Sequence, residues 1–128
     1  HGPGQLVGYP ILDLNDHGRD AHLYLRWLEA VLIETLNAFD IQAERRAGLT
    51  GVWVGHRKIA SIGVHLSRWV TWHGFALNVD MDLSPFQWIV PCGIAGVEMV
   101  SMASLLGKAV SLEEVTESVM GHFCRIFP

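Results

Sequence analysis

The sequence contains few of the residues that build metal centres or disulfide frameworks. Its 128 residues include only two cysteines, Cys92 and Cys124, too few to cross-link a small secreted domain. Neither cysteine stands in a C-x-x-C pattern, and the seven histidines show no H-x-x-x-H or H-E-x-x-H spacing. No metal site is therefore predicted, and a reduced, cytoplasm-like compartment is the expected setting.

Charged residues are also scarce, at 17% of the chain, against about 25% in typical soluble domains. The formal net charge is −4, and the nine basic residues are scattered. This distribution argues against a nucleic-acid partner, since phosphate binding requires clustered lysine and arginine. The nucleotide-binding patterns G-x-x-x-x-G-K-[ST] and G-x-G-x-x-G are missing, so no cofactor is predicted.

Long apolar runs are missing as well, although half of the residues are hydrophobic. No stretch reaches the ~18 uninterrupted apolar residues of a membrane crossing, so no membrane association is expected. Residues 1–4 have neither the basic region nor the apolar core of a secretory signal. The length predicts a single domain over residues 1–128. The charged residues that interrupt the apolar segments are Glu29, Glu34, Lys58, Arg68, Glu98 and Lys108.

Apolar periodicity predicts a mixed α/β fold in which a sheet packs with two main helices. A short strand interrupted by Pro10 is expected over residues 5–14, with a turn after it. A helix is expected over residues 19–39, with Glu29 and Glu34 facing away from its apolar stripe. That stripe comprises Tyr24, Leu28, Val31, Leu32, Thr35 and Phe39.

The rest of the sequence predicts further strands and a second helix. Residues 55–57 have the length of a three-residue hairpin loop, so Lys58 begins a strand. The glycine at position 74 predicts a bulge or a close backbone approach inside a later strand. Ser111 and Glu114 form the capping box of a helix. The expected strands cover residues 51–54, 58–64, 69–72 and 75–79.

Cys92 stands between Pro91 and Gly93, a context with two interpretations. It is either a small buried hydrophobe or a nucleophile on a tight loop, where the glycine leaves room for an incoming carbonyl. A nucleophilic thiol needs a nearby base or cation, because a thiol of ordinary pKa is mostly protonated at neutral pH. Lys58 is the leading candidate for this partner, and the alternative is a solvated lysine at a hairpin end.

Two histidines and several glycines are further candidates. His73 is either a base that partners Cys92 or a packed ring among aromatic neighbours. His1 either lines a pocket or belongs to a frayed terminus. The glycines that let backbone amides approach a ligand, or that serve only as turn residues, are Gly2, Gly4, Gly63 and Gly74.

Five segments, in order along the chain, carry a family resemblance. They read HGPGQLVGY at residues 1–9, GVWV at 51–54, KIASIG at 58–63, HGFALN at 73–78 and PCGI at 91–94. Together they resemble the lipoate-protein octanoyltransferases, and the resemblance covers nearly the whole chain. It implies an α/β fold shared with lipoate and biotin protein ligases, and a cysteine-lysine dyad.

The resemblance also implies roles for individual residues. Cys92 matches the cysteine that holds the octanoyl group as a thioester, and Lys58 matches the lysine that tunes it. His1 matches the histidine that closes the family's first signature, Arg-Gly-Gly-x-x-Thr-Tyr-His. The rest of that signature is absent from these residues, so we expect the domain to lack its N-terminal part and, alone, to be unstable or inactive. The implied acyl-site residues are Ser61, Ile62, Gly63, Gly74, Phe75 and Ala76.

The implied reaction moves an octanoyl group from octanoyl-acyl carrier protein to a lysine of a lipoyl domain. The implied acceptors are 2-oxoacid dehydrogenase acyltransferase subunits and the glycine cleavage H protein, and the implied location is the bacterial cytoplasm. Three alternatives stay open: an ATP-dependent lipoate ligase of the same fold, a cysteine hydrolase that uses Cys92 and His73, and a non-catalytic binding module.

Overall fold

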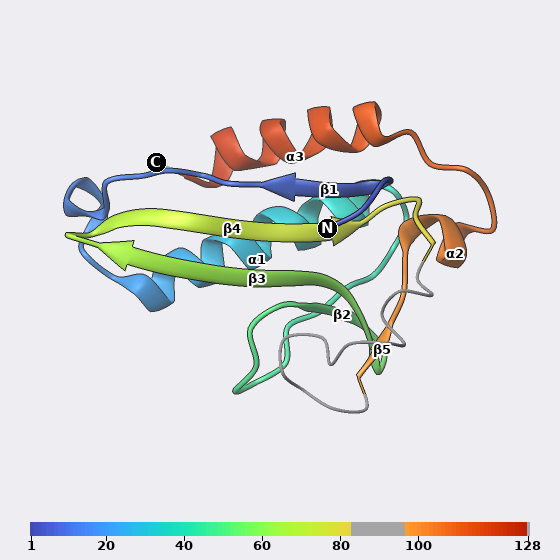
Figure 1. Cartoon of the computed structure of the whole chain (residues 1–128), viewed down its shortest axis with the longest axis horizontal. Coiled ribbons are helices and arrows are strands. Elements are labelled where there is room, and N and C mark those ends of the chain that lie inside the picture. Colours follow the sequence, from blue (N-terminus) through green and yellow to red (C-terminus); the bar gives the residue numbers. More distant parts are fainter. Residues whose placement is uncertain (83–96, 128) are drawn as a thin grey trace.

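The computed structural model describes residues 1–82 and 97–127. Strands form a sheet, and the two long helices pack together on one side of it (Figure 1). The predicted mixed α/β fold is therefore confirmed. The elements, in order, are β1 (Gln5–Gly8), η1 (Leu14–His17), α1 (Ala21–Ala38), β2 (Val52–Val54), β3 (Arg57–Ser67), β4 (Val70–Asn78), β5 (Glu98–Met99), α2 (Met102–Leu106) and α3 (Leu112–Ile126).

The sheet is centred on the long hairpin of β3 and β4. The strand order is β1-β4-β3-β2 with antiparallel neighbours, and β5 pairs with β3 in parallel. Arg68 and Trp69 connect β3 to β4, with φ of 50° and 65°. A two-residue turn with positive φ at both positions matches the right-handed twist of the strands it joins. The hairpin therefore holds a continuous register, from Ser67 opposite Val70 to Ala60 opposite Leu77.

Local signals define where the helices begin. Asp20 caps α1 by accepting a hydrogen bond from the backbone N–H of Leu23 at 2.9 Å. Ser111 caps α3 in the same way, accepting from the N–H of Glu114 at 3.2 Å. Such caps satisfy backbone donors that have no partner within the helix. The predicted start of the last helix is confirmed.

The core lies between the sheet and the two long helices. Leu28, Leu32 and Leu36 of α1 are fully buried, and they share one apolar core with Leu77 of β4 and Val115 of α3. Burying one such leucine contributes about 1.5–3 kcal/mol. The hydrophobic contacts therefore fix which face of the sheet the helices cover.

Glu29 does not face away from the protein, so that prediction is wrong. Its side chain is fully buried, and its carboxylate accepts a hydrogen bond from Arg26 and forms an ion pair with Nε of Arg45 at 3.3 Å. The N–H of Gly51 donates to the same carboxylate at 3.2 Å. The chain between α1 and β2 covers this side of the helix, which the helix's own periodicity cannot reveal.

Two strand boundaries also differ from the sequence prediction. The first strand ends at Gly8 rather than at residue 14, and pairing resumes only as a single bridge between Asp13 and Val70. The hairpin loop after β2 has two residues, because Arg57 already pairs with Val54. Within residues 1–82 and 97–127, no helix has the length and apolarity to cross a membrane.

Candidate active site

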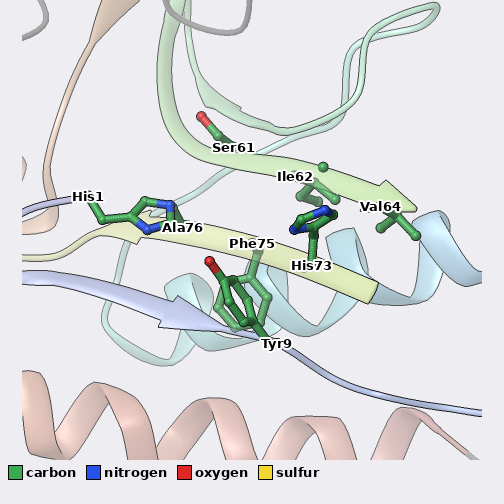
Figure 2. Close-up of a pocket in the computed structure, with 10 residues that line it drawn as sticks. His1, Tyr9, Ser61, Ile62, Val64, His73, Phe75 and Ala76 are labelled. Carbon is green, nitrogen blue, oxygen red and sulfur yellow. The ribbon is translucent and has the colours of Figure 1, made fainter. Parts of the chain in front are cut away.

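One cavity of about 390 Å³ lies over the middle of the β3–β4 hairpin (Figure 2). We call it the hairpin cavity. Of the nine described site residues that the sequence pointed to, the structure brings eight around this cavity, all except Lys58, together with Tyr9 and Val64, which sequence reasoning missed. Its lining residues are His1, Tyr9, Ser61, Ile62, Gly63, Val64, His73, Gly74, Phe75 and Ala76.

Strand alternation divides the hairpin between two faces. Ala60, Ile62 and Leu77 point to the helices and belong to the core. Ser61 is paired with Ala76, and Gly63 with Gly74, so these four residues point to the opposite side, which we call the far face. Small residues on the far face leave room above the sheet, and this room is the hairpin cavity.

Gly74 allows the chain that follows β1 to run in close contact with β4 beside the cavity. A side chain at this position would place its Cβ 2.1 Å from the carbonyl oxygen of Gly8, far inside van der Waals contact. The predicted close backbone approach is therefore confirmed, and the alternative of a bulge is not, because the register is continuous here. This close approach places Tyr9 at the rim of the cavity (Figure 2).

Partly buried hydrogen bonds hold residues 10–12 of this segment in place. The hydroxyl of Thr71 donates to the carbonyl of Pro10 at 2.9 Å and accepts from the N–H of Leu12 at 2.8 Å. The hydroxyl of Tyr24 also donates to the Pro10 carbonyl, at 3.4 Å. Burial raises the pKa of Tyr24, and its hydrogen bond with Thr71 opposes that rise.

His73 occupies a strained backbone position at the cavity. Its φ is 62°, a left-handed conformation that costs energy for any residue other than glycine. Alternation alone would send its side chain toward the helices with Phe75. Instead the ring is exposed and lies 6.3 Å from that of Tyr9 and 6.5 Å from that of His65, centroid to centroid.

Lys58 reaches the far face through an irregularity in β3. Val52 pairs with Ala60 but the next residue, Trp53, pairs with Lys58, so β3 holds one extra residue at Ile59. Val52, Ile59 and Ala60 all belong to the core. Lys58 therefore points to the opposite side with Trp53, as a bulge reverses the alternation.

The side chain of Lys58 is buried, with 1% of its surface exposed. Its Nζ lies 5.3 Å from the centroid of the Trp53 ring, where a cation is attracted to the aromatic face. Gly51 makes room for it, because a Cβ there would lie 2.8 Å from Cε of Lys58. The alternative of a solvated hairpin-end lysine is thus wrong.

His1 lies at the Ala76 side of the cavity (Figure 2). A chain of side-chain hydrogen bonds ties down the residues next to it. The N–H of Gly2 donates to Oε1 of Gln5 at 3.3 Å, and Nε2 of Gln5 donates to Oδ1 of Asn78 at 3.0 Å. Asn78 is buried and donates to the carbonyl of Val100 at 3.0 Å. His1 therefore has an anchored neighbour rather than a frayed one.

The predicted nucleophile, Cys92, lies in residues 83–96, outside the described residues. The other cysteine, Cys124, is exposed on α3, a helix on the side of the sheet away from the cavity. Across the part of the chain that the structure describes, no three His, Cys, Asp or Glu side chains cluster in a way that could hold a metal ion.

Comparison with solved structures identifies the class of fold. Biotin protein ligase from Aquifex aeolicus superimposes with a TM-score of 0.75 over 96% of this chain and 52% of that one, at 18% identity. A lipoate-protein ligase A bound with ATP superimposes with a TM-score of 0.68 over 95% and 50%, at 14% identity. The fold is thus the one shared by biotin and lipoate protein ligases.

Sequence comparison narrows this class. Residues 1–124 match the family described as the lipoyl protein ligase A/B catalytic domain, and the chain belongs to that family. It is 61% identical over 127 residues to an octanoyltransferase of Solibacter usitatus, and 58% identical over 127 residues to one of Gloeobacter violaceus. These matches cover 99% of this chain but 57% and 56% of the two relatives, so the chain spans somewhat over half their length.

Proposed function

We propose that the protein carrying this chain is an octanoyltransferase, which moves an octanoyl group from octanoyl-acyl carrier protein to a lysine of a lipoyl domain. The observation that carries the proposal is a buried lysine, Lys58, on the same sheet face as the hairpin cavity. The names of the similar octanoyltransferases supply the acyl group. The reaction is proposed to take place in the bacterial cytoplasm.

In the first step, the Cys92 thiol gives its proton to Lys58 and the thiolate attacks the thioester carbonyl of the donor. A new carbon–sulfur bond holds the octanoyl group on Cys92. The donor's carbon–sulfur bond breaks, and its thiolate takes the proton back from Lys58. The octanoyl chain lies meanwhile in the hairpin cavity, which excludes part of the surrounding water.

In the second step, the amine of the acceptor lysine attacks the acyl-enzyme. An amide bond forms, the thiolate of Cys92 leaves, and Lys58 takes the proton that the nitrogen loses. The acceptors are proposed to be lipoyl domains of 2-oxoacid dehydrogenase acyltransferase subunits and of the glycine cleavage H protein. Exchange of a thioester for an amide is downhill, so the reaction needs no ATP.

The acyl-enzyme can be tested by intact-protein mass spectrometry. The intact protein is incubated with octanoyl-acyl carrier protein in the absence of ATP, and it should gain the mass of one octanoyl group. Cys92→Ala should abolish the adduct, whereas Cys124→Ala should retain it, because Cys124 lies on α3. A requirement for ATP, with no adduct on either cysteine, would instead identify a ligase.

The role of Lys58 is tested with the chain's other lysine as the matched control. Lys58→Met keeps an unbranched side chain beside Trp53 but cannot carry a proton. Transfer should fall by about 10²–10⁴-fold, the usual contribution of a positioned base. Lys108→Met, at an exposed position after α2, should keep the unmodified rate. Equal rates in both variants would contradict the proposal.

A further inference from the structure

A second cavity of about 500 Å³ adjoins the hairpin cavity, and two residues line both. These are Tyr9 and His73. The second cavity is completed by His65, Ser67 and Trp72, which come from the part of the hairpin closer to its turn. Tyr9 and His73 therefore lie between the two cavities rather than at the outer end of one.

The position of Lys58 gives the hairpin cavity a direction. Lys58 precedes Ser61 on β3 and points to the same face, so the reacting carbonyl belongs at the Ser61 side. From Ser61 to Val64 the strand advances by roughly 10 Å, at about 3.3 Å per residue. An extended octanoyl chain has a similar length, about 9 Å, because its carbon–carbon bonds are about 1.5 Å long. The end of such a chain reaches the position of His73, which pairs with Val64.

From this geometry we infer that the rings of Tyr9 and His73 form a wall that closes the hairpin cavity and limits the acyl group to about eight carbons. The inference rests on the proposed function, since it assumes that the cavity holds the acyl chain. With the wall in place the second cavity is cut off. Without it, the two cavities form one longer channel along the hairpin, and longer acyl groups fit.

The wall consists of side chains that can be removed without rebuilding the sheet. The two rings meet edge to face, at an interplanar angle of 90°, and Tyr9 is 57% exposed. The left-handed backbone at His73 turns its ring toward Tyr9 and His65. The strained backbone of His73 therefore shapes the cavity, because an extended backbone would point the ring toward the helices instead.

The test compares transfer of octanoyl, decanoyl and dodecanoyl groups by the intact protein and by its His73→Gly variant. Glycine adopts φ near 62° without strain, so the variant opens the wall and keeps the fold. The ratio of dodecanoyl to octanoyl kcat/KM should rise by at least about tenfold, since one misfit methylene in an apolar pocket changes kcat/KM by roughly 10–200-fold. Tyr9→Ala should shift the ratio in the same direction.

Two further variants sharpen the test. Trp69→Gly is the matched control, because Trp69 also has a left-handed backbone, with φ of 65°, and lines neither cavity. It should leave the ratio unchanged. Gly63→Val acts in the opposite direction: a Cβ at position 63 meets no atom within 4 Å and projects from the cavity floor. This variant should prefer hexanoyl over octanoyl groups.

If the ratio of dodecanoyl to octanoyl kcat/KM is unchanged in both His73→Gly and Tyr9→Ala, the inference that these rings form a wall is overturned. Loss of octanoyl transfer in His73→Gly, with an unchanged ratio in Tyr9→Ala, also overturns it and assigns His73 to the chemistry. If the unmodified protein transfers no acyl group, the proposed function fails. Calorimetry with octanoic and dodecanoic acid then tests the wall alone: tighter binding of dodecanoic acid to His73→Gly supports it, and unchanged binding overturns it.

Discussion

The two faces of the sheet are built from the same two strands but in different ways. Toward the helices, β3 and β4 present Ile59, Ile62 and Leu77, which are buried in a continuous apolar core. On the far face they present glycines, small residues and rings, with Gly63 and Trp72 exposed. The face with regular large apolar residues holds the fold together, and the face that departs from that pattern forms the cavities.

The largest effect on stability should come from the helix-covered face. Leu28→Ala removes a fully buried side chain of α1, and the cavity it leaves should lower the free energy of unfolding by about 2–5 kcal/mol. Urea unfolding of the intact protein measures this. Met120→Ala on α3, where the side chain is 63% exposed, should change stability by less than about 0.5 kcal/mol. A similar decrease in the free energy of unfolding of the two variants would contradict the expected difference between core and surface positions.

An intermediate effect should separate two glycines of the far face. Gly74→Ala forces a Cβ against the carbonyl of Gly8 and should cost about 1–3 kcal/mol, as overpacking does. Gly63→Ala places its methyl group in open space and should be neutral or slightly stabilising, since glycine weakens strands. Thermal unfolding of both variants tests the difference, and a stable Gly74→Ala protein would mean that the backbone of Gly8 is not tightly held against Gly74.

The smallest effect concerns pH and the buried tyrosine that donates to the carbonyl of Pro10, Tyr24. The pKa of Tyr24 is raised in the folded protein above its ordinary value of 10.0, so the folded state keeps the proton longer than the unfolded state. Its contribution to stability is complete below pH 10 and is lost as the pH rises from 10 through the folded pKa. Tyr24→Phe should flatten this alkaline decline. Tyr9→Phe, at an exposed position, should leave it unchanged.

Local sequence signals predicted the elements that depend on near neighbours. The capping serine at position 111 predicted the start of α3, and the alternation after Lys58 predicted β3. Both signals depend only on residues a few positions apart in the sequence. The cavity residues were found by motif, and the sheet register explains why they belong together: Ser61 faces Ala76, and Gly63 faces Gly74. Pairing of this kind brings distant segments onto one face.

Features that depend on distant contacts were not predicted. Glu29 is polar and off the apolar stripe, yet residues beyond the helix bury it and supply its donors. Tyr9 stood within a quoted motif but had no signal of its own, since only the close approach of its segment to Gly74 brings it to the cavity. The left-handed backbone of His73 is also invisible to periodicity, which assumes a regular strand.

The extra residue at Ile59 makes the orientation of Lys58 depend on a count of residues rather than on their identity. Deleting one residue between Lys58 and Ser61 would keep the amine, the tryptophan and the cavity, but would turn the amine through the sheet toward the leucines of α1. Insertions and deletions in this short stretch are therefore more damaging to the proposed chemistry than substitutions, and any redesign of β3 has to preserve its one extra residue relative to β2.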